Sequence, residues 1–261
     1  MRRALLVILM ALAPAASALP AQGLSAAELK AFDRGDRESR ALLGSITCLE
    51  RLTAAVRENR VVAMEKWMTA RQCVVINKHL VWVTLGGDTS LTRATRVKAY
   101  DLTTSRPYAG PLNTASVLAM ARAERRIAVR VSARFQAARR PATPITFRFD
   151  GDSVEVWMLP RPLLTGESSA LGGEIGGVFA PDGREFVREV DHFDDYWTIA
   201  MPDTGVVRIV SRQLRIPSIS EFLLAYQLHA RDRSIVVEMP WGTAALARGT
   251  GGKWVMVVGR R

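Results

Sequence analysis

Hydrophobic positions in the N-terminal part of the chain recur at helical spacing. Ser25 and Glu28 form an S-x-x-E pattern, typical of a capping box, so we expect a helix that begins there and runs towards Leu43, with Gly44 as its stop. Two further apolar stripes predict two further helices. The first stripe is formed by Cys48, Leu49, Leu52, Ala55 and Val56. The second, within residues 61–72, is formed by Val61, Met64, Trp67 and Met68.

After Cys73 the pattern becomes strand-like. Residues 74–85 are rich in β-branched and aromatic side chains and end at a glycine turn, which predicts a strand, and residues 92–102 are expected to return beside it. Turn residues at Asp150-Gly151-Asp152 and Pro181-Asp182-Gly183 each separate two alternating runs, which predicts two hairpins.

The strongest alternation in the sequence lies at residues 126–136, after a helix predicted at 113–124. Ile127, Val129 and Val131 would point one way and Arg126, Arg130 and Arg134 the other. This pattern predicts a strand of an antiparallel sheet that is covered on one face only.

The C-terminal part repeats these signals. A further strand is expected at 204–216, and Ser218 and Glu221 form a second S-x-x-E pattern that predicts a short helix. Three last strands are expected in residues 233–258, separated by glycine-containing turns. The longest loop is expected at 160–177.

These elements define an α+β class, with N-terminal helices packed on or beside a mainly antiparallel sheet, either sandwich-like or a partly open barrel. The expected domains are a helical subdomain at 22–73 and a mainly antiparallel β domain at 74–261 with one or two short helices. The composition, with 48% hydrophobic residues, is that of a folded protein rather than a disordered one.

Residues 1–21 have the layout of a cleavable secretory signal. Arg2 and Arg3 precede an apolar run of about ten residues and a small-residue stretch, and such a run is too short to span a bilayer. We therefore expect an exported protein, periplasmic or secreted, of bacterial character and with no transmembrane segment in the mature chain.

The chain contains two cysteines, Cys48 and Cys73, and an exported pair favours a disulfide. Such a bond would tie the end of one predicted helix to the end of the next. Its closed loop spans about 25 residues, and the lost chain entropy corresponds to about 3 kcal/mol of stabilisation.

The net charge is +11, most of it from arginine, which favours an anionic partner. The arginines are nevertheless scattered along the chain. The best candidate polyanion-binding group is Arg126, Arg130 and Arg134, on the outward face of the predicted strand. Nucleic acid is disfavoured, because the nearby aromatic side chains fall on the inward face and cannot stack on bases.

Residues 191–197, DHFDDYW, contain the densest group of metal-ligand and acid/base side chains. Asp191, His192, Asp194 and Asp195 offer suitable atoms for a cation. In an extended segment, however, they divide between two faces, and the motif matches no established metal pattern. The alternative interpretation is a polar loop at the end of a strand, whose aromatic residues cover the core.

Three functions remain open at this point. The first is a non-enzymatic binding or scaffolding protein, with no cofactor and with an unknown partner such as an anionic envelope component or another exported protein. The second is a metal-dependent hydrolase that uses Asp191, His192, Asp194 and Asp195 to activate water. The third is a polyanion-binding protein that uses the three arginines. The sequence favours the first.

Overall fold

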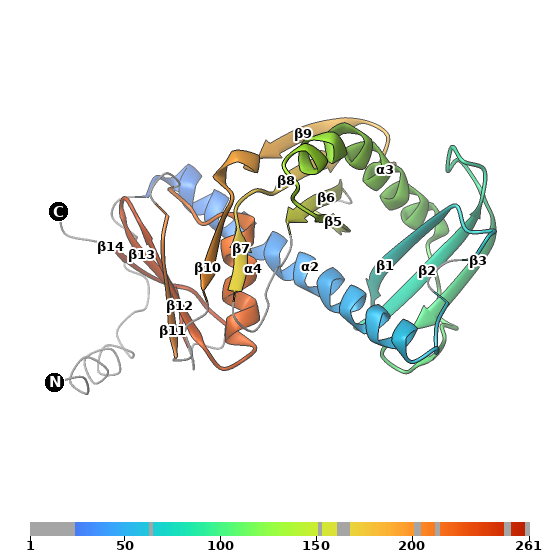
Figure 1. Ribbon diagram of the computed structural model, residues 1–261, viewed down its shortest axis with the longest axis horizontal. Coiled ribbons are helices and arrows are strands. Elements are labelled where there is room, and N and C mark those ends of the chain that lie inside the picture. Colours follow the sequence, from blue (N-terminus) through green and yellow to red (C-terminus); the bar gives the residue numbers. More distant parts are fainter. Residues whose placement is uncertain are drawn as a thin grey trace.

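A long helix, α2 (Ala26–Arg57), runs through the molecule from one end to the other (Figure 1). The computed structural model describes residues 24–62, 65–150, 153–160, 168–200, 205–211, 215–247 and 252–258, so the predicted signal segment lies outside the described residues. The capping box at the start of α2 is confirmed. The Ser25 N–H donates to Glu28 Oε2 at 2.7 Å, and the Glu28 N–H donates to Ser25 Oγ at 3.2 Å.

The predicted stop at Gly44 is wrong, since the first two predicted helices are one. The two glycines of α2 mark close packing instead. A Cβ at Gly35 would lie 2.7 Å from the Phe222 ring, and one at Gly44 would lie 3.2 Å from the Val75 side chain. The third predicted helix is also wrong, because residues 65–69 are not helical and a strand begins at Ala70.

Sheet A is an antiparallel meander in the order β1-β2-β3-β4. Its strands are β1 (Ala70–Ile76), β2 (His79–Gly87), β3 (Ala94–Asp101) and β4 (Arg106–Pro107). The stretch predicted as one strand is therefore a hairpin. Asn77 and Lys78 form its turn with φ of 48° and 69°, the left-handed conformation that a two-residue hairpin of this kind requires.

Helix α3 (Thr114–Ala137) replaces the strand predicted at 126–136, so that prediction is wrong. Ile127 and Val131 are buried, whereas Val129 is 80% exposed. Positions four apart lie on one face of a helix and also on one face of a strand, so Ile127, Val131 and Phe135 fit both periods. No breaking residue separates them from the Asn113 cap, which favours one continuous helix.

Sheet B follows in the order β5-β6-β8-β9, and all its pairings are antiparallel. Its strands are β5 (Ala142–Phe149), β6 (Ser153–Pro160), β8 (Ile175–Phe179) and β9 (Phe186–Asp191). Both predicted hairpins are confirmed. The loop predicted at 160–177 is wrong in part, because β7 (Ser168–Leu171) lies within it and pairs with β10 (Trp197–Ala200).

The C-terminal part contains helix α4 and sheet D. The sheet has the order β11-β12-β13-β14, with β11 (Val206–Val210), β12 (Ser234–Met239), β13 (Gly242–Leu246) and β14 (Val255–Val258). Helix α4 (Ile219–His229) begins at the predicted capping box of Ser218 and Glu221. Because this helix connects β11 to β12, those two strands are parallel, the one exception among the described pairings.

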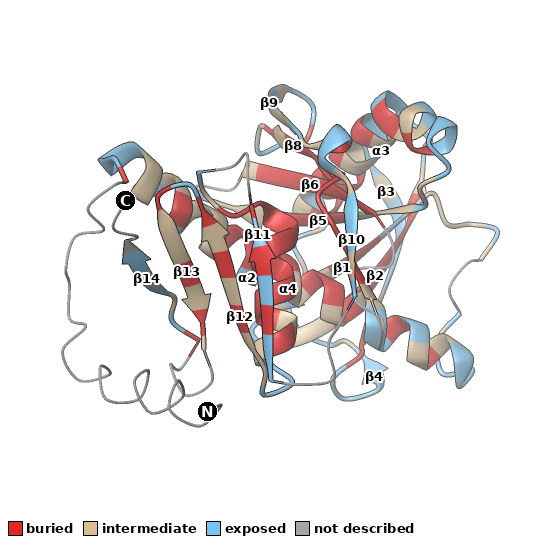
Figure 2. Ribbon diagram, turned by 60° about the vertical axis from the view of Figure 1, so that its left-hand side comes forward, coloured by how far each residue is buried: buried red, intermediate tan, exposed pale blue. Residues whose placement is uncertain are grey.

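The inner strands β2 and β6 of sheets A and B are covered on both faces by helices. In β2, Val81 and Val83 pack against α3 while Trp82 packs with α2. In β6, Val156 faces α3 and Trp157 faces α2. The expectation of one wet face is therefore wrong for these two strands, and Figure 2 shows β6 buried along its length.

The fold class is α+β, as predicted, with helices packed on mainly antiparallel open sheets. Each of the described helices precedes an antiparallel set of strands in the chain. Among the described residues, none of the helices combines the length and the apolar character that crossing a bilayer requires.

Candidate functional site

The acidic segment 191–197 lies at the junction of sheets B and C, where sheet C is the pair β7 and β10. Asp191 ends β9 and forms an ion pair with Arg134 of α3, and Asp191 Oδ1 accepts from the Phe193 N–H at 3.0 Å. Burial opposes ionisation of Asp191, but the Arg134 guanidinium and the Phe193 N–H together outweigh it and lower the pKa of the carboxyl. This side chain is therefore already occupied as a structural ion pair.

The other three candidate ligands do not converge on one point. His192 Nδ1 lies 3.3 Å from Asp195 Oδ2, and Asp194 is exposed. Within the part of the chain that the structure describes, no three His, Cys, Asp or Glu side chains are grouped so that they could hold a metal ion.

Two of the three aromatic residues of the segment, Phe193 and Tyr196, pack on their surroundings, whereas Trp197 is 38% exposed. Phe193 packs edge-to-face on Phe135, with ring centroids 5.1 Å apart. The guanidinium of Arg140 lies 4.9 Å from the Phe193 ring and 4.4 Å from the Tyr196 ring. These contacts fit the alternative interpretation, in which the segment covers the core.

The three candidate polyanion-binding arginines lie on helix α3 rather than on a strand. Their spacing of four residues still places them on one helix face. Arg130 pairs with Glu189 at 2.7 Å and Arg134 pairs with Asp191, whereas Arg126 is exposed and has no partner among the described residues. Polyanion binding by this group stays a prediction.

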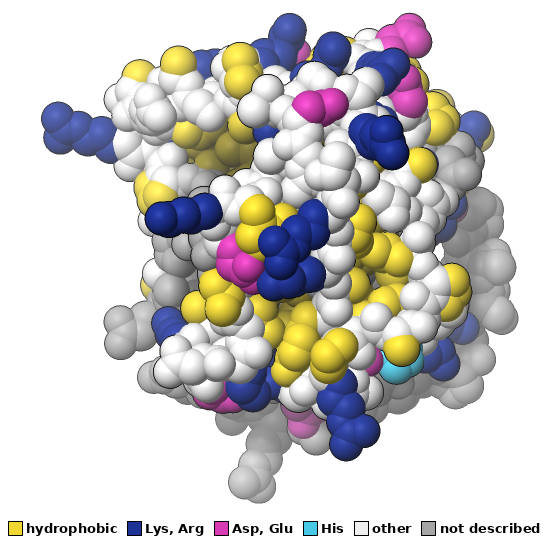
Figure 3. Space-filling view, turned by 90° about the vertical axis from the view of Figure 1, so that its right-hand side faces the viewer, with side chains coloured by type: hydrophobic (Ala, Val, Ile, Leu, Met, Phe, Trp, Pro, Cys, Tyr) yellow, Lys and Arg dark blue, Asp and Glu magenta, His cyan; other side chains and the backbone are white. Residues whose placement is uncertain are grey.

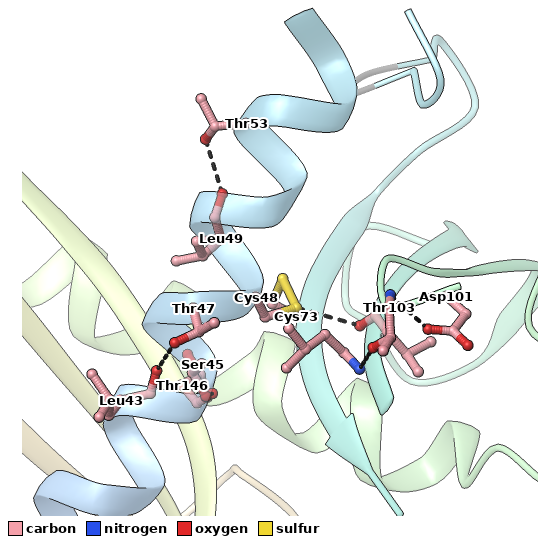
Figure 4. The surroundings of a disulfide bond; sticks show 12 residues. Leu43, Ser45, Thr47, Cys48, Leu49, Thr53, Cys73, Asp101, Thr103 and Thr146 are labelled. Carbon is pink, nitrogen blue, oxygen red and sulfur yellow. Dashed lines mark hydrogen bonds between the residues drawn. A yellow bond between two sulfur atoms is a disulfide. The ribbon is translucent and has the colours of Figure 1, made fainter. Parts of the chain in front are cut away.

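Cys48 and Cys73 form the predicted disulfide, with their Cα atoms 5.8 Å apart (Figure 4). The bond links the middle of α2 to β1, rather than two helix ends as predicted. Both residues are buried beside Trp82. The bond therefore holds α2 against one edge of sheet A.

That edge lies next to an edge of sheet B. Strands β1 and β5 are the edge strands of their sheets, and they contact each other without pairing as strands. Pro144 lies within β5, and it has no N–H to donate across the gap. Helix α2 covers one side of this gap and α3 the other.

Side chains bridge the two edges at their midpoint. Glu124 of α3 accepts from Gln72 Nε2 of β1 at 2.7 Å and from Thr146 Oγ1 of β5 at 3.1 Å, both at Oε2. From the opposite side, Ser45 Oγ donates to the Thr146 carbonyl at 3.5 Å. Burial raises the pKa of Glu124, although the two hydrogen bonds oppose the shift.

The gap opens into a cavity at each end. Cavity 1, at the start of β1 and β5, has a volume of about 490 Å³, and cavity 2, at their ends, about 430 Å³. Ser45 and Cys73 line both. Cavity 1 is the more polar of the two, since it includes Arg71, Glu124 and Arg231 besides apolar walls. Figure 3 shows hydrophobic side chains lining hollows at the sheet A end, with basic side chains scattered around them.

Of the residues that line cavity 1, the sequence pointed to Leu49 and Leu52 as part of a helix stripe and to Cys73 as half of a disulfide, but to none as a binding residue. The available signal was Glu124. It lies four residues after Met120 and three before Ile127, on the apolar face of α3. A carboxylate on such a face needs buried partners, but the signal is readable only when residues 114–137 are taken as one helix.

A second group of buried carboxyls lies where α4 meets the turn before β8. Glu221 and Glu174 are both buried, and neither oxygen of Glu174 has a hydrogen-bond partner among the described residues. Burial raises the pKa of Glu174 and raises that of Glu221 to about 7, and the neighbouring Glu174 adds to the shift of Glu221. Both groups therefore resist ionisation in the folded protein.

Replacing Glu221 with Gln should stabilise the protein above neutral pH. The pKa of Glu221 is about 7 in the folded protein and 4.5 for an ordinary glutamate, so the unfolded chain loses this proton at a lower pH than the folded protein does. The wild-type protein therefore loses stability as the pH rises from 4.5 through 7. Glutamine still accepts from the Ser218 N–H and cannot ionise, so we expect a gain of roughly 3 kcal/mol at pH 8 and none at pH 4. Urea unfolding at several pH values measures this.

The matched control is Glu28→Gln, at the capping box of α2. The Ser25 N–H and Arg215 lower the pKa of Glu28 to about 2, so its ionised form stabilises the fold above pH 4.5, the ordinary pKa of a glutamate. The E28Q substitution should therefore lower stability at pH 8, the opposite sign. Equal changes in the free energy of unfolding at pH 8 for E221Q and E28Q would contradict the buried environment of Glu221 and the ion-paired environment of Glu28. The free energy of unfolding of E221Q should still depend on pH, because burial also raises the pKa of Glu155 to about 7.

No protein-family model matches the chain, and neither a curated protein nor a solved structure is significantly similar to it. The class that the fold defines is an α+β protein in which two helices enclose the gap between two sheets. Its function is therefore inferred from the geometry of the chain itself.

Proposed function

We propose that this chain is a non-enzymatic binding protein that holds a small ligand in cavity 1. The observation that carries the proposal is the cavity itself. Its volume of about 490 Å³ lies in the range of small-molecule sites, and its lining combines apolar side chains with polar and charged ones.

The walls of cavity 1 come from α2, β1, β2, α3 and β5, together with Gln227 of α4 and Arg231 just after that helix. Each of these elements packs in a hydrophobic cluster, and the disulfide adds a covalent link beside the cavity. A site built on such elements keeps its shape without a ligand, which lowers the entropic cost of binding.

We further propose that the protein works outside the cytoplasm. The pattern of residues 1–21 supports export. The disulfide is compatible with an oxidising compartment, where such bonds persist.

Blocking cavity 1 should abolish binding of small amphipathic molecules. Ala142 lines the cavity at the start of β5, so Ala142→Phe fills part of its volume. A library of such molecules is screened by thermal shift on the wild type, and the dissociation constants of the hits are measured by calorimetry. We expect binding to Ala142→Phe to weaken at least tenfold, because the ring occupies space that the ligand needs.

The control is Ala137→Phe, which adds the same ring at an exposed position at the end of α3. It should leave the affinities unchanged. Hits that bind both variants as tightly as the wild type would place the site elsewhere and overturn the proposal, as would a screen without hits.

A further inference from the structure

The polar groups that line cavity 1 divide into those with partners and those without. The carboxyl of Glu124 accepts from Gln72 and Thr146, and the Ser45 hydroxyl donates to a carbonyl of β5. The Thr53 hydroxyl likewise donates to the Leu49 carbonyl. These groups are satisfied within the protein.

The groups without partners are mainly donors. Trp82 lines the cavity and is 4% exposed, and its Nε1 has no hydrogen-bond partner among the described residues. Arg71 and Arg231 also line the cavity; both are exposed, and neither guanidinium forms a hydrogen bond or an ion pair within the described chain, although Arg71 lies near enough to Glu124 to act on its pKa. An indole N–H and a guanidinium can donate but cannot accept.

We propose that the ligand of cavity 1 is an amphipathic anion, a small organic acid whose anionic group is bound by Arg71 and Arg231 and whose apolar part lies between α2 and β5. This inference rests on the proposed function and specifies its ligand class. The anionic group replaces water as the acceptor for the two exposed guanidinium groups, which pair well with carboxylate or sulfonate oxygens.

The apolar part of the ligand has matching walls. Side chains of α2 and β5 form most of them: Ile46, Leu49, Leu52, Pro144 and Ile145. Trp82 adds a flat aromatic surface. An alkyl chain or an aromatic ring would gain free energy by leaving water for these walls.

The charge balance also favours an anion. The protein carries a net charge of +11, which raises the local concentration of anions at its surface. One acidic side chain, Glu50, is exposed among the lining residues beside the two arginines. Glu124 repels an anion less than an ordinary carboxylate does, because burial raises its pKa and favours its neutral form.

Calorimetry with four probes of equal alkyl length tests the charge preference. The probes are octanoate, octanesulfonate, octanol and octylammonium. We expect the two anions to bind at least about tenfold more tightly than octanol, since a hydrogen bond to a charged group contributes enough for such a difference. Octylammonium should bind more weakly than octanol. Octanol binding as tightly as the anions, or octylammonium binding most tightly, overturns the inference.

Variants of the protein test the residues. Arg71→Gln and Arg231→Gln should each weaken octanoate binding about tenfold. The control is Arg126→Gln, which removes the same charge from an exposed arginine that lies outside cavity 1 and has no partner among the described residues. Thermal unfolding checks that each variant is folded. Equal weakening by all three would assign the effect to net charge and contradict a site at the two arginines.

A fourth variant separates the charge of the ligand from the integrity of the cavity. Glu124→Gln keeps an oxygen that accepts from Gln72 and Thr146, so octanoate affinity should stay equal or rise. The opposite result would be that the wild type binds octylammonium more tightly than octanoate and that Glu124→Gln no longer binds octylammonium. The ligand would then be a cation, and the proposed binding function would still hold. Library hits whose dissociation constants are the same for Ala142→Phe and the wild type would instead reject the proposed binding function itself.

Discussion

Replacing Ile127 with Asp should destabilise the protein by roughly 4 kcal/mol or more, while Val129→Asp should change its stability by no more than about 0.5 kcal/mol. Ile127 is fully buried between α3 and sheet B, so an aspartate there removes core packing and buries a charge. Val129 is 80% exposed on the opposite side of the helix. Urea unfolding followed by circular dichroism at pH 7 measures both.

This pair of substitutions distinguishes the helix from the strand that the alternation of residues 126–136 predicts. In a strand, Ile127 and Val129 share a face, and both aspartates would be equally damaging. In the helix, positions 127 and 129 are two apart in sequence and therefore point to nearly opposite sides. Similar losses of stability at the two positions would contradict the helical assignment.

Removing the disulfide with Cys48→Ala and Cys73→Ala should lower the free energy of unfolding by about 3 kcal/mol. The bond closes a loop between residues separated by 25 positions, and without it the unfolded chain gains conformational freedom. Both positions are buried, and alanine leaves only a small change in the packed volume. Chemical unfolding of the oxidised wild type and of the double variant gives the difference.

Reductant provides the control for this experiment. It should lower the stability of the wild type to about that of the double variant and should not affect the variant itself. If mass spectrometry shows two free thiols in reduced wild-type protein and its unfolding midpoint is unchanged, the stabilising role of the bond is rejected.

The elements that were predictable from the sequence are those with a local chemical cause. The capping boxes at Ser25 and Ser218 begin helices because hydroxyl and carboxylate groups satisfy backbone N–H groups three residues away. The hairpins of sheet B form at turns that aspartate and glycine favour. Such signals depend on few residues and do not require knowledge of the rest of the fold.

The errors arose where distant packing decides the outcome. Gly44 does not end α2, because the surrounding sheets and α4 stabilise the helix beyond it. Residues 65–69 have helical spacing, yet the chain turns there to begin sheet A. In both places, tertiary contacts override a local preference.

The candidate site was harder to predict than the fold. The composition of residues 191–197 drew attention to a segment whose side chains are largely engaged in structural contacts with α3 and with one another. The lining of cavity 1 is instead dispersed from Ser45 to Arg231 along the chain. Neither the gap between β1 and β5 nor the free donors around it can be recognised before the sheets are placed.

Helix α2 contributes side chains to three separate hydrophobic clusters, through Phe32 near its start, Leu42 in the middle and Leu52 towards its end. It thus links the hydrophobic clusters of sheets A, B and D, and α3 also packs on the first two of these sheets. Separating α2 from any one of the sheets would expose to water the apolar side chains of the cluster that they share.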